Sequence, residues 1–379
     1  MNSFKKYLKT IELRNFVMIG ALLLIWVVFS TLTGGSFLLT RNISNLVRHM
    51  ALVGILGIGM TMVIITGNID LSVGSILGAM GGLAAVLHVW YGVGTYQTIG
   101  IVLLVSMIIG TAQGAIISYL KVPAFIVTLG GLLIFRGVQL GLTKGISIAP
   151  FADTYKIYGQ AYIAPSIVWV LAIATSIVLF LLDAKKRSDR IKYKFEVSNF
   201  GIFIGKNVVL TLIILFVAFI LNSYRGLPMQ VFLMMLLVVI FTFVTQKTTF
   251  GRSIYAMGGN FEASLYSGIK VKRNLVIVYA INGLMAGIAA VVITARLNAG
   301  TPTAGMNMEL DAIASSVIGG TSMSGGVGKV YGAILGALFM ASIDNGMSMM
   351  NIDAYWQYIV KGVILVVAVW FDIYSSKKA

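Results

Sequence analysis

The sequence predicts an all-α protein that crosses a lipid bilayer many times. Of its 379 residues, 58% are hydrophobic and only 11% are charged. A soluble domain is usually about half apolar and about a quarter charged. Several apolar runs also reach the ~20 residues that a helix needs to cross the hydrocarbon layer. Because these runs do not alternate between polar and apolar residues, they do not indicate a transmembrane β-barrel.

The apolar runs predict about twelve spans. The first run, at 16–32, follows a basic start that is typical of a signal peptide. It lacks a small-residue cleavage pattern, so we expect a retained span. The segment 310–319 is too short to cross alone and is a candidate re-entrant segment. The predicted spans are 16–32, 50–66, 75–90, 98–120, 124–142, 166–182, 208–221, 229–245, 274–293, 310–319, 330–349 and 356–371.

Lysine and arginine are distributed unevenly over the connections between these spans. With the N-terminus in the cytoplasm, most of the 28 basic residues lie in inner segments. Membrane proteins concentrate basic residues in their short cytoplasmic loops, so both termini are predicted to lie inside. The same rule accounts for the net charge of +16 without a nucleic-acid partner. The outer segments then hold only Arg41, Arg48, Lys144, Lys156, Arg225 and Arg296.

Residue types that carry metal, nucleotide or acid–base chemistry are scarce. Two histidines and no cysteine cannot form a metal-ligand cluster of normal spacing. The nearest approach to a P-loop, at Gly328 and Lys329, has Met323 where a glycine is required and Val330 after the lysine. No nucleophile, base and orienting group stand out. We therefore expect no catalytic residue, no metal and no cofactor in this chain.

Some ionisable residues lie in or against apolar sequence. A charge at bilayer depth is costly and usually faces a polar cavity or a partner. Each residue therefore has two interpretations, a structural ion pair or the lining of a transport path. For Arg136, Asp344 and Lys361 we favour the structural role. The full set is Asp70, Arg136, Glu309, Asp311, Asp344 and Lys361.

An uncharged, hydroxyl-rich ligand would need hydrogen-bonding groups along its path. Polar residues on or beside the apolar spans include Thr61, Thr66, Asn68, Gln113, Thr128, Gln139, Asn282, Thr294 and Asn345. Three polar residues before the third span have a local alternative, because short polar side chains also cap helix N-termini. Our candidates for the translocation path, which include those three, are Asn68, Asp70, Ser72, Thr128, Asn282, Glu309 and Asp311.

Two sets of glycines indicate a weak internal repeat. Each set has a spacing of four, opens a predicted span and follows a polar, glycine-rich turn. Small residues at this spacing share one helix face and allow another backbone to approach closely. The turns either serve this packing alone or also line the inner mouth of a path. A duplicated bundle is common in transporters. The sets are Gly74, Gly78, Gly82 and Gly328, Gly332, Gly336.

The segment 246–273, QKTTFGRSIYAMGGNFEASLYSGIKVKR, is a long polar connection between two apolar runs. It contains a predicted short helix with Asn260 as N-cap and Gly268 as its stop. Phe261, Leu265 and Ile269 recur at i, i+4 and i+8 and form an apolar stripe. Such a helix would either dock in a groove on a cytoplasmic partner or lie on lipid. The segment 183–206 is a second, strongly basic inner loop with the character of an insertion.

Four segments carry a resemblance to a known family: GNIDLSVGS at 67–75, VPAFIVTLGG at 122–131, GRSIYAMGGNFEASLYSGIKV at 251–271 and ELDAIASSVIGGTSMSGG at 309–326. They resemble the ribose/xylose/galactose-type sugar permeases of binding-protein-dependent ABC importers. The ordered set is specific, although each motif alone would be weak. The resemblance implies a single permease domain over 1–379, with a ten-span core and two inserted spans around 183–206. That insertion resembles the longer xylose-type members.

The resemblance also implies partners and a coupling site. A homodimer would carry a sugar across the cytoplasmic (inner) membrane of a prokaryote. A cytoplasmic ATPase with two fused halves would bind ATP and Mg²⁺, and an external binding protein would deliver the sugar. Where the family commonly has proline and a basic residue in the coupling helix, this chain has Phe261 and Leu265 or Tyr266. The residues at matching coupling positions are Gly259, Asn260, Glu262, Ala263, Ser267 and Gly268.

The leading interpretation is therefore a passive subunit that conducts a monosaccharide, such as the pentose xylose, while a separate ATPase supplies the energy. The alternative is a stand-alone ion-coupled transporter with Asp70 or Asp311 as its ion site. A membrane enzyme would need an acid–base or metal constellation that the sequence does not offer. The sequence leaves open which sugar is carried, the resting conformation, and whether 310–319 crosses or re-enters.

Overall fold

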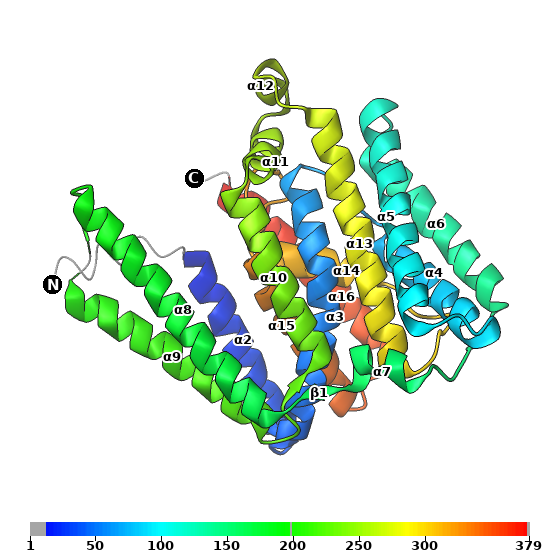
Figure 1. Ribbon diagram of the computed structural model, residues 1–379, viewed down its shortest axis with the longest axis horizontal. Helices are drawn as coiled ribbons and strands as arrows, with labels where there is room; N and C mark the ends of the chain where they lie inside the picture. The colour runs from blue at the N-terminus through cyan, green and yellow to red at the C-terminus, as the bar shows by residue number, and fades with distance from the viewer. Residues whose placement is uncertain (1–12, 198, 377–379) are drawn as a thin grey trace.

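The computed structural model describes residues 13–197 and 199–376, and nearly all of them are helical (Figure 1). Two two-residue strands, β1 (Tyr162–Ile163) and β2 (Leu227–Pro228), pair antiparallel. A 3-10 turn, η1 (Ser36–Leu38), precedes α3, and a π-helical turn, η2 (Val86–Trp90), extends α4. The α-helices are α2 (Leu13–Leu32), α3 (Thr40–Ile65), α4 (Val73–Ala85), α5 (Thr95–Tyr119), α6 (Ala124–Thr143), α7 (Asp153–Gln160), α8 (Pro165–Lys192), α9 (Phe200–Asn222), α10 (Met229–Lys247), α11 (Thr249–Gly259), α12 (Phe261–Tyr266), α13 (Val271–Leu297), α14 (Met308–Ile318), α15 (Val330–Met349) and α16 (Ala354–Ser376).

The predicted all-α, many-span class is confirmed. Among the described residues, 10 helices are long and apolar enough to cross a membrane. The two other predicted spans correspond to α2, whose apolar part at Met18–Leu32 is shorter, and to α14, which has 11 residues. Every predicted span thus coincides with a helix. The number that cross, and the orientation of the chain, remain predictions.

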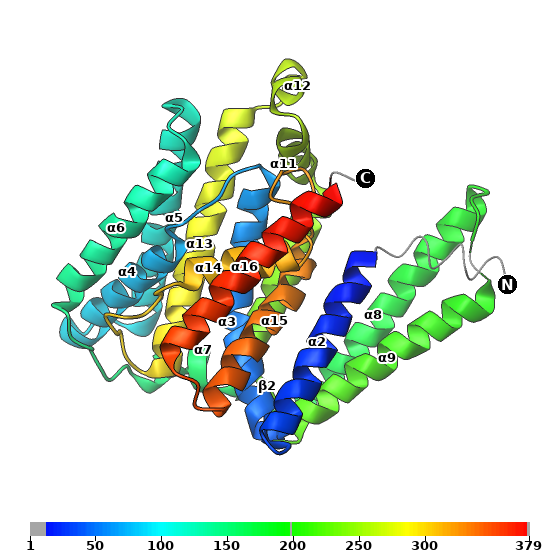
Figure 2. The ribbon, with the colours of Figure 1, turned by 180° about the vertical axis from the view of Figure 1, so that it is seen from behind.

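Two central helices organise the bundle. Helix α3 packs on α14 and α15, whereas α13 packs on α4 and α5, and α3 and α13 also contact each other. The two run in opposite directions, as Figure 1 and the reverse view in Figure 2 show. The order α3–α4–α5 is therefore repeated in inverted form by α13–α14–α15. Inverted repeats of this kind are a common architecture of transporters.

Glycines make the close contacts of this arrangement possible. A Cβ on Gly332 or Gly336 of α15 would overlap the backbone of Gly319 or Ser315. In α4, Gly74 faces Gly305 in the same way. The packing role predicted for the two glycine sets is thus confirmed, whereas the lining of a path stays a prediction.

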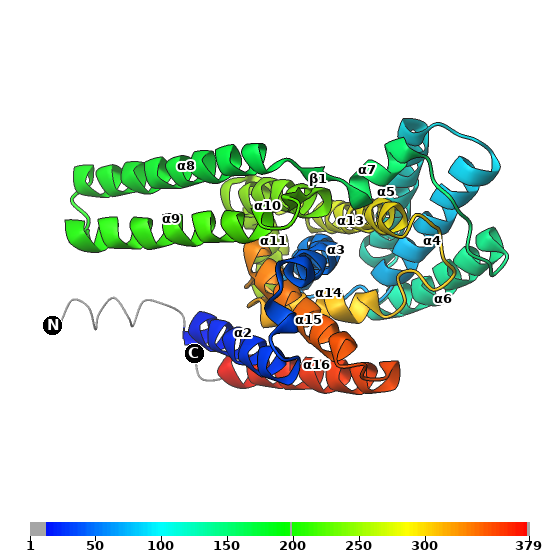
Figure 3. The same cartoon turned by 90° about the horizontal axis from the view of Figure 1, so that it is seen from below.

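The segment 183–206 is mostly helical in the structure. Helix α8 continues to Lys192 and α9 already begins at Phe200. The two helices form a hairpin that extends away from the rest of the bundle (Figure 3). Lys206 on α9 donates to Asp183 on α8 over 2.9 Å, so the inserted helices are joined near their basic end.

One end of the molecule collects the polar connections. Helices α11 and α12 lie there, together with the described C-terminal end of α16 (Figures 1 and 2). At this end Gly326 N donates to Ile65 O over 2.8 Å, and Ser322 Oγ donates to Asp372 over 3.1 Å. The paired strands lie at the opposite end. The end that carries α11 and α12 is the predicted cytoplasmic face.

Candidate coupling surface and translocation path

Helices α11 and α12 owe their boundaries to local capping. Thr248 Oγ1 accepts from Gly251 N over 3.1 Å at the start of α11. Asn260 Oδ1 accepts from Ala263 N over 2.9 Å at the start of α12, the N-cap role predicted for it. Gly268 follows α12 with φ +78, a left-handed conformation that glycine adopts without a steric cost. The predicted helix is real but short, and Ile269 of the predicted stripe lies beyond its end.

Helix α12 presents its side chains to the outside. All six predicted coupling residues are exposed. Phe261, Leu265 and Tyr266 are exposed as well, although burial of large apolar side chains is favourable. Only Ser264 of this helix is buried. The surface formed by residues 259–268, here called the α12 surface, therefore has the shape and apolar content of a docking element.

Helix α11 fastens the α12 surface to the bundle. Ile254 and Met257 are buried, and Gly258 approaches the backbone of Ile65 and Gly326 so closely that a Cβ would overlap both. Tyr255 donates its phenol to Gly328 O over 2.7 Å, and burial raises the pKa of this phenol, which keeps the donor protonated. Helix α11 thus connects the α12 surface to the end of α3 and to the turn before α15.

Four of the seven candidate path residues meet at the start of α4. Asp70 Oδ1 accepts from Ser72 N over 2.7 Å and from Ser72 Oγ over 2.6 Å. Asp70 Oδ2 accepts from Asn282 of α13 over 2.7 Å. Thr128 of α6 donates to Ala124 O and contacts Ile69 O. We call Asp70, Ser72 and Asn282 the Asp70 cluster; it joins the two inverted repeats.

Around the Asp70 cluster, some polar groups are hydrogen-bonded and others have no hydrogen-bond partner. Gln113 of α5 donates to Ser72 Oγ over 2.9 Å. Asn282 Oδ1 and the buried phenol of Tyr279 have no hydrogen-bond partner among the described residues. Of the three residues predicted as possible caps, Asp70 accepts from backbone N–H at the start of α4, whereas the Ser72 side chain makes no cap bond.

The three other path candidates lie elsewhere. Asn68 bonds locally to Thr66 over 3.1 Å and does not join the Asp70 cluster. Glu309 lies in the first turn of α14, with its carboxylate against Gly74 of α4. Asp311, one half-turn further along α14, faces a different set of charges.

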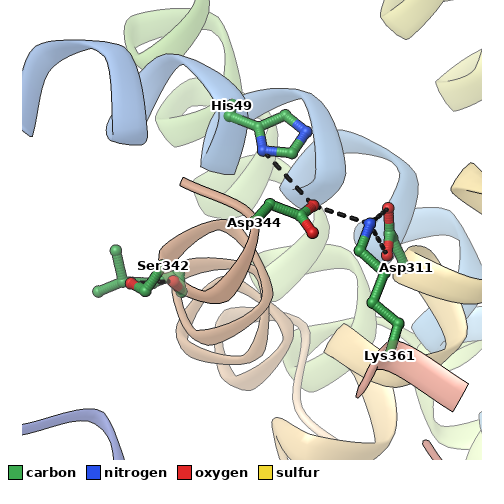
Figure 4. A network of polar contacts seen from close by, with 6 residues as sticks. His49, Asp311, Ser342, Asp344 and Lys361 are labelled. Carbon is green, nitrogen blue, oxygen red and sulfur yellow. Dashed lines mark hydrogen bonds and ion pairs between the residues drawn. The ribbon is translucent and has the colours of Figure 1, made fainter. Parts of the chain in front are cut away.

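Asp311 belongs to an ion network that sequence analysis did not assemble (Figure 4). Lys361 of α16 donates to Asp311 of α14 over 3.0 Å and pairs with Asp344 of α15 over 2.8 Å. His49 of α3 lies 3.9 Å from Asp344 Oδ2. These four residues, the Lys361 network, connect four helices. The structural ion pair expected for Asp344 and Lys361 is present.

The structure also sorts the remaining polar residues. Gln139 donates to Thr301 O and Ala304 O, and Arg136 donates to Gln139 over 3.1 Å. Asn345 and Asn42 exchange a pair of hydrogen bonds. These contacts fix segments to one another, and no signal in the sequence indicated the pairings. Within the described ranges, no group of three or more histidine, cysteine or acidic residues could hold a metal.

The inverted bundle, the exposed helix at one end and the buried polar clusters define a polytopic membrane transporter subunit. Residues 42–369 match the model of the family described as "Branched-chain amino acid transport system / permease component", and the chain belongs to this permease family. It is the membrane-spanning permease of an ABC sugar importer located in the inner membrane and is not an enzyme; ATP is hydrolysed by a separate subunit.

The relatives are close and extend over nearly the whole chain. The xylose transport system permease protein XylH of Haemophilus influenzae is 44% identical over 372 residues, or 98% of this chain and 99% of the relative. XylH of Escherichia coli K12 is also 44% identical, over 98% and 95%. The ribose import permease protein RbsC of Bacillus subtilis is 33% identical, over 92% and 90%. No solved structure matches the chain significantly.

Proposed function

We propose that this permease conducts a pentose, xylose in the first place, and that an ATPase drives it through the α12 surface. The carrying observation is the full-length identity of 44% to xylose permeases, compared with 33% or less to the ribose permeases. The inserted α8–α9 hairpin lies within the part of the chain that aligns with the xylose relatives.

The coupling step rests on the way in which α12 is attached. The exposed α12 surface docks on the cytoplasmic ATPase, and closure of that ATPase on ATP displaces α12. Helix α11 passes the motion to Ile65 and Gly326, which it contacts directly. Helix α3 ends at Ile65, and α15 begins shortly after Gly326. Because α3 belongs to one inverted repeat and α15 to the other, the two repeats move relative to each other. The pathway then alternates between outward-open and inward-open states.

The translocation path is proposed to follow the polar residues between the repeats. The Asp70 cluster and Glu309 supply carboxylates, amides and hydroxyls that can exchange hydrogen bonds with the hydroxyls of a sugar. Two copies of this permease, one ATPase with two fused halves and an external sugar-binding protein complete the proposed importer. The sugar is delivered from outside by the binding protein.

Reconstitution tests the proposal. The permease is placed in proteoliposomes with the ATPase and binding protein of its importer, and uptake of radiolabelled xylose is measured. We expect uptake only with ATP and all components, and neither uptake nor ATPase activity from the permease alone. Uptake by the permease alone under an ion gradient would instead support an ion-coupled transporter. The similarity to permease components of transport systems favours the ATPase-driven importer over that alternative.

Variants of the α12 surface test coupling. Glu262→Ala removes an exposed charge, and Gly268→Ala strains a residue with φ +78 by about 1–2 kcal/mol. We expect each to reduce the xylose imported per ATP hydrolysed at least tenfold, with normal membrane insertion. Asp353→Ala, an exposed acidic residue at the opposite end, is the control. Normal coupling in both α12 variants would refute the docking role.

A further inference from the structure

A cavity adjoins the Lys361 network on the side of α16. Its volume is about 100 Å³. Because a cavity needs ~10–15 Å³ to hold one water, this one has room for several water-sized groups. Its polar lining residues are Asn307, Asp311, Tyr358 and Lys361, and Leu310 and Met340 contribute an apolar wall.

The cavity offers hydrogen-bonding capacity that the protein itself does not use. Asp311 is only 4% exposed, and its Oδ1 accepts no hydrogen bond from any described group, although the Lys361 ammonium lies 3.0 Å away. Lys361 is held by Asp311 and Asp344, so its position is fixed. A hydroxyl group in the cavity would donate to Asp311 Oδ1 and accept from the ammonium or from the Asn307 amide.

The lining offers both kinds of contact that a sugar makes. Sugar rings have hydroxyls at their edges and an apolar face, and here a carboxylate, an ammonium, an amide and a phenol stand opposite apolar side chains. An acyl chain would leave Asp311 Oδ1 without a donor, which is costly at membrane depth. The cavity also adjoins α14, whose first turn carries the path candidates Glu309 and Asp311.

We propose that this cavity among α14, α15 and α16 is a monosaccharide subsite, in which Asp311, Lys361 and Asn307 bind the hydroxyls of the transported sugar. The inference rests on the proposed function and assigns a substrate contact to residues outside the Asp70 cluster. Tyr358 stands at the mouth, where it is about half exposed. Asp344 is a positioning residue, since it holds Lys361 and is not among the lining residues.

A side chain added at Gly362 tests the subsite by filling it. Gly362 lines the cavity, and a Cβ there would meet no atom within 4 Å, so the fold has no reason to change. We expect Gly362→Leu to reduce xylose uptake at least tenfold in the complete importer, with unchanged thermal stability. Gly205→Leu on the α8–α9 hairpin, also free of contacts within 4 Å, is the matched control and should transport normally.

A chemical probe gives a readout that does not depend on uptake. The natural chain has no cysteine, so Gly362→Cys introduces a unique thiol. We expect xylose, presented by the binding protein during ATP turnover, to slow modification of this thiol by a methanethiosulfonate reagent at least fivefold. A sugar that the wild-type importer does not carry should give no protection.

Variants of two carboxylates distinguish a sugar-binding role of the cavity from a role in holding Lys361 in place. Asp311→Asn and Asp344→Asn each remove one partner of Lys361, but only Asp311 lines the cavity. We expect Asp311→Asn to reduce uptake at least fivefold more than Asp344→Asn does. Normal uptake by Gly362→Leu, or no protection of the thiol, would overturn the subsite while the importer function stands. A wild-type importer that carries no sugar would refute the proposed function itself.

Discussion

The two inverted repeats place a carboxylate near the start of a short helix in different surroundings. Asp70, before α4, receives three hydrogen bonds from neutral donors: Ser72 N, Ser72 Oγ and Asn282. Asp311, in the first turn of α14, is paired with an ammonium that it shares with Asp344. Asp70 is 1% exposed and tightly enclosed, whereas Asp311 borders a cavity. The carboxylates near the starts of α4 and α14 therefore have different electrostatic surroundings.

The comparison teaches how a buried charge can be held in two ways. Neutral donors fix Asp70 without bringing a second charge into the bundle. An ammonium compensates charge but must itself be desolvated, which offsets much of the attraction. Removal of the Lys361 ammonium should therefore lower the free energy of unfolding more than removal of the Asp70 charge does.

Lys361→Met gives the largest expected effect. It leaves Asp311 and Asp344 buried without a cation, and breaking a buried pair in this way costs about 3–5 kcal/mol. Thermal unfolding in detergent should show a large drop in melting temperature. The triple variant Lys361→Met, Asp311→Asn, Asp344→Asn removes every charge together and should recover most of the loss. Equal melting of Lys361→Met and the wild type would show that the network does not stabilise the fold.

Asp70→Asn is expected to cost less. The amide keeps the shape of the carboxylate but offers one oxygen to three donors, and hydrogen bonds to charged groups are worth about 1.5–3 kcal/mol. We expect a loss of about 2 kcal/mol, measured by the same unfolding experiment. Ser72→Ala, which removes one donor and keeps the charge, should lie between Asp70→Asn and the wild type. If Asp70→Asn lowered the free energy of unfolding more than Lys361→Met does, the expected order of the two repeats would be wrong.

His49→Gln should have the smallest effect. The imidazole lies 3.9 Å from Asp344 Oδ2 and its side chain is 28% exposed, so the contact is long and open to solvent. Such pairs contribute about 0–1 kcal/mol. We expect a melting temperature close to that of the wild type, with Lys361 unchanged as the partner of both carboxylates. A loss as large as that of Lys361→Met would make His49 a full member of the network.

Helix α12 could be predicted from the sequence because its signals are local. Asn260 caps α12 through a contact to Ala263, three residues away, and Gly268 follows the helix with a positive φ. Both signals lie in adjacent residues. The predicted bounds, from Asn260 to the stop at Gly268, enclose the observed helix Phe261–Tyr266, whereas Ile269 of the apolar stripe lies outside it. The basic segment 183–206 was predicted as a loop because charge interrupts hydropathy, although it does not interrupt a helix.

The sequence by itself determined that this is a many-span helical permease with an exposed polar element between two spans. Hydropathy and capping act over one helix or one turn, so the information lies in contiguous residues. Only the tertiary structure decided which buried polar groups meet. Asp311 finds Lys361 at a separation of 50 residues, and Asp70 finds Asn282 at 212. Such pairs depend on how the inverted repeats pack, and apolar spans of similar composition do not specify their neighbours.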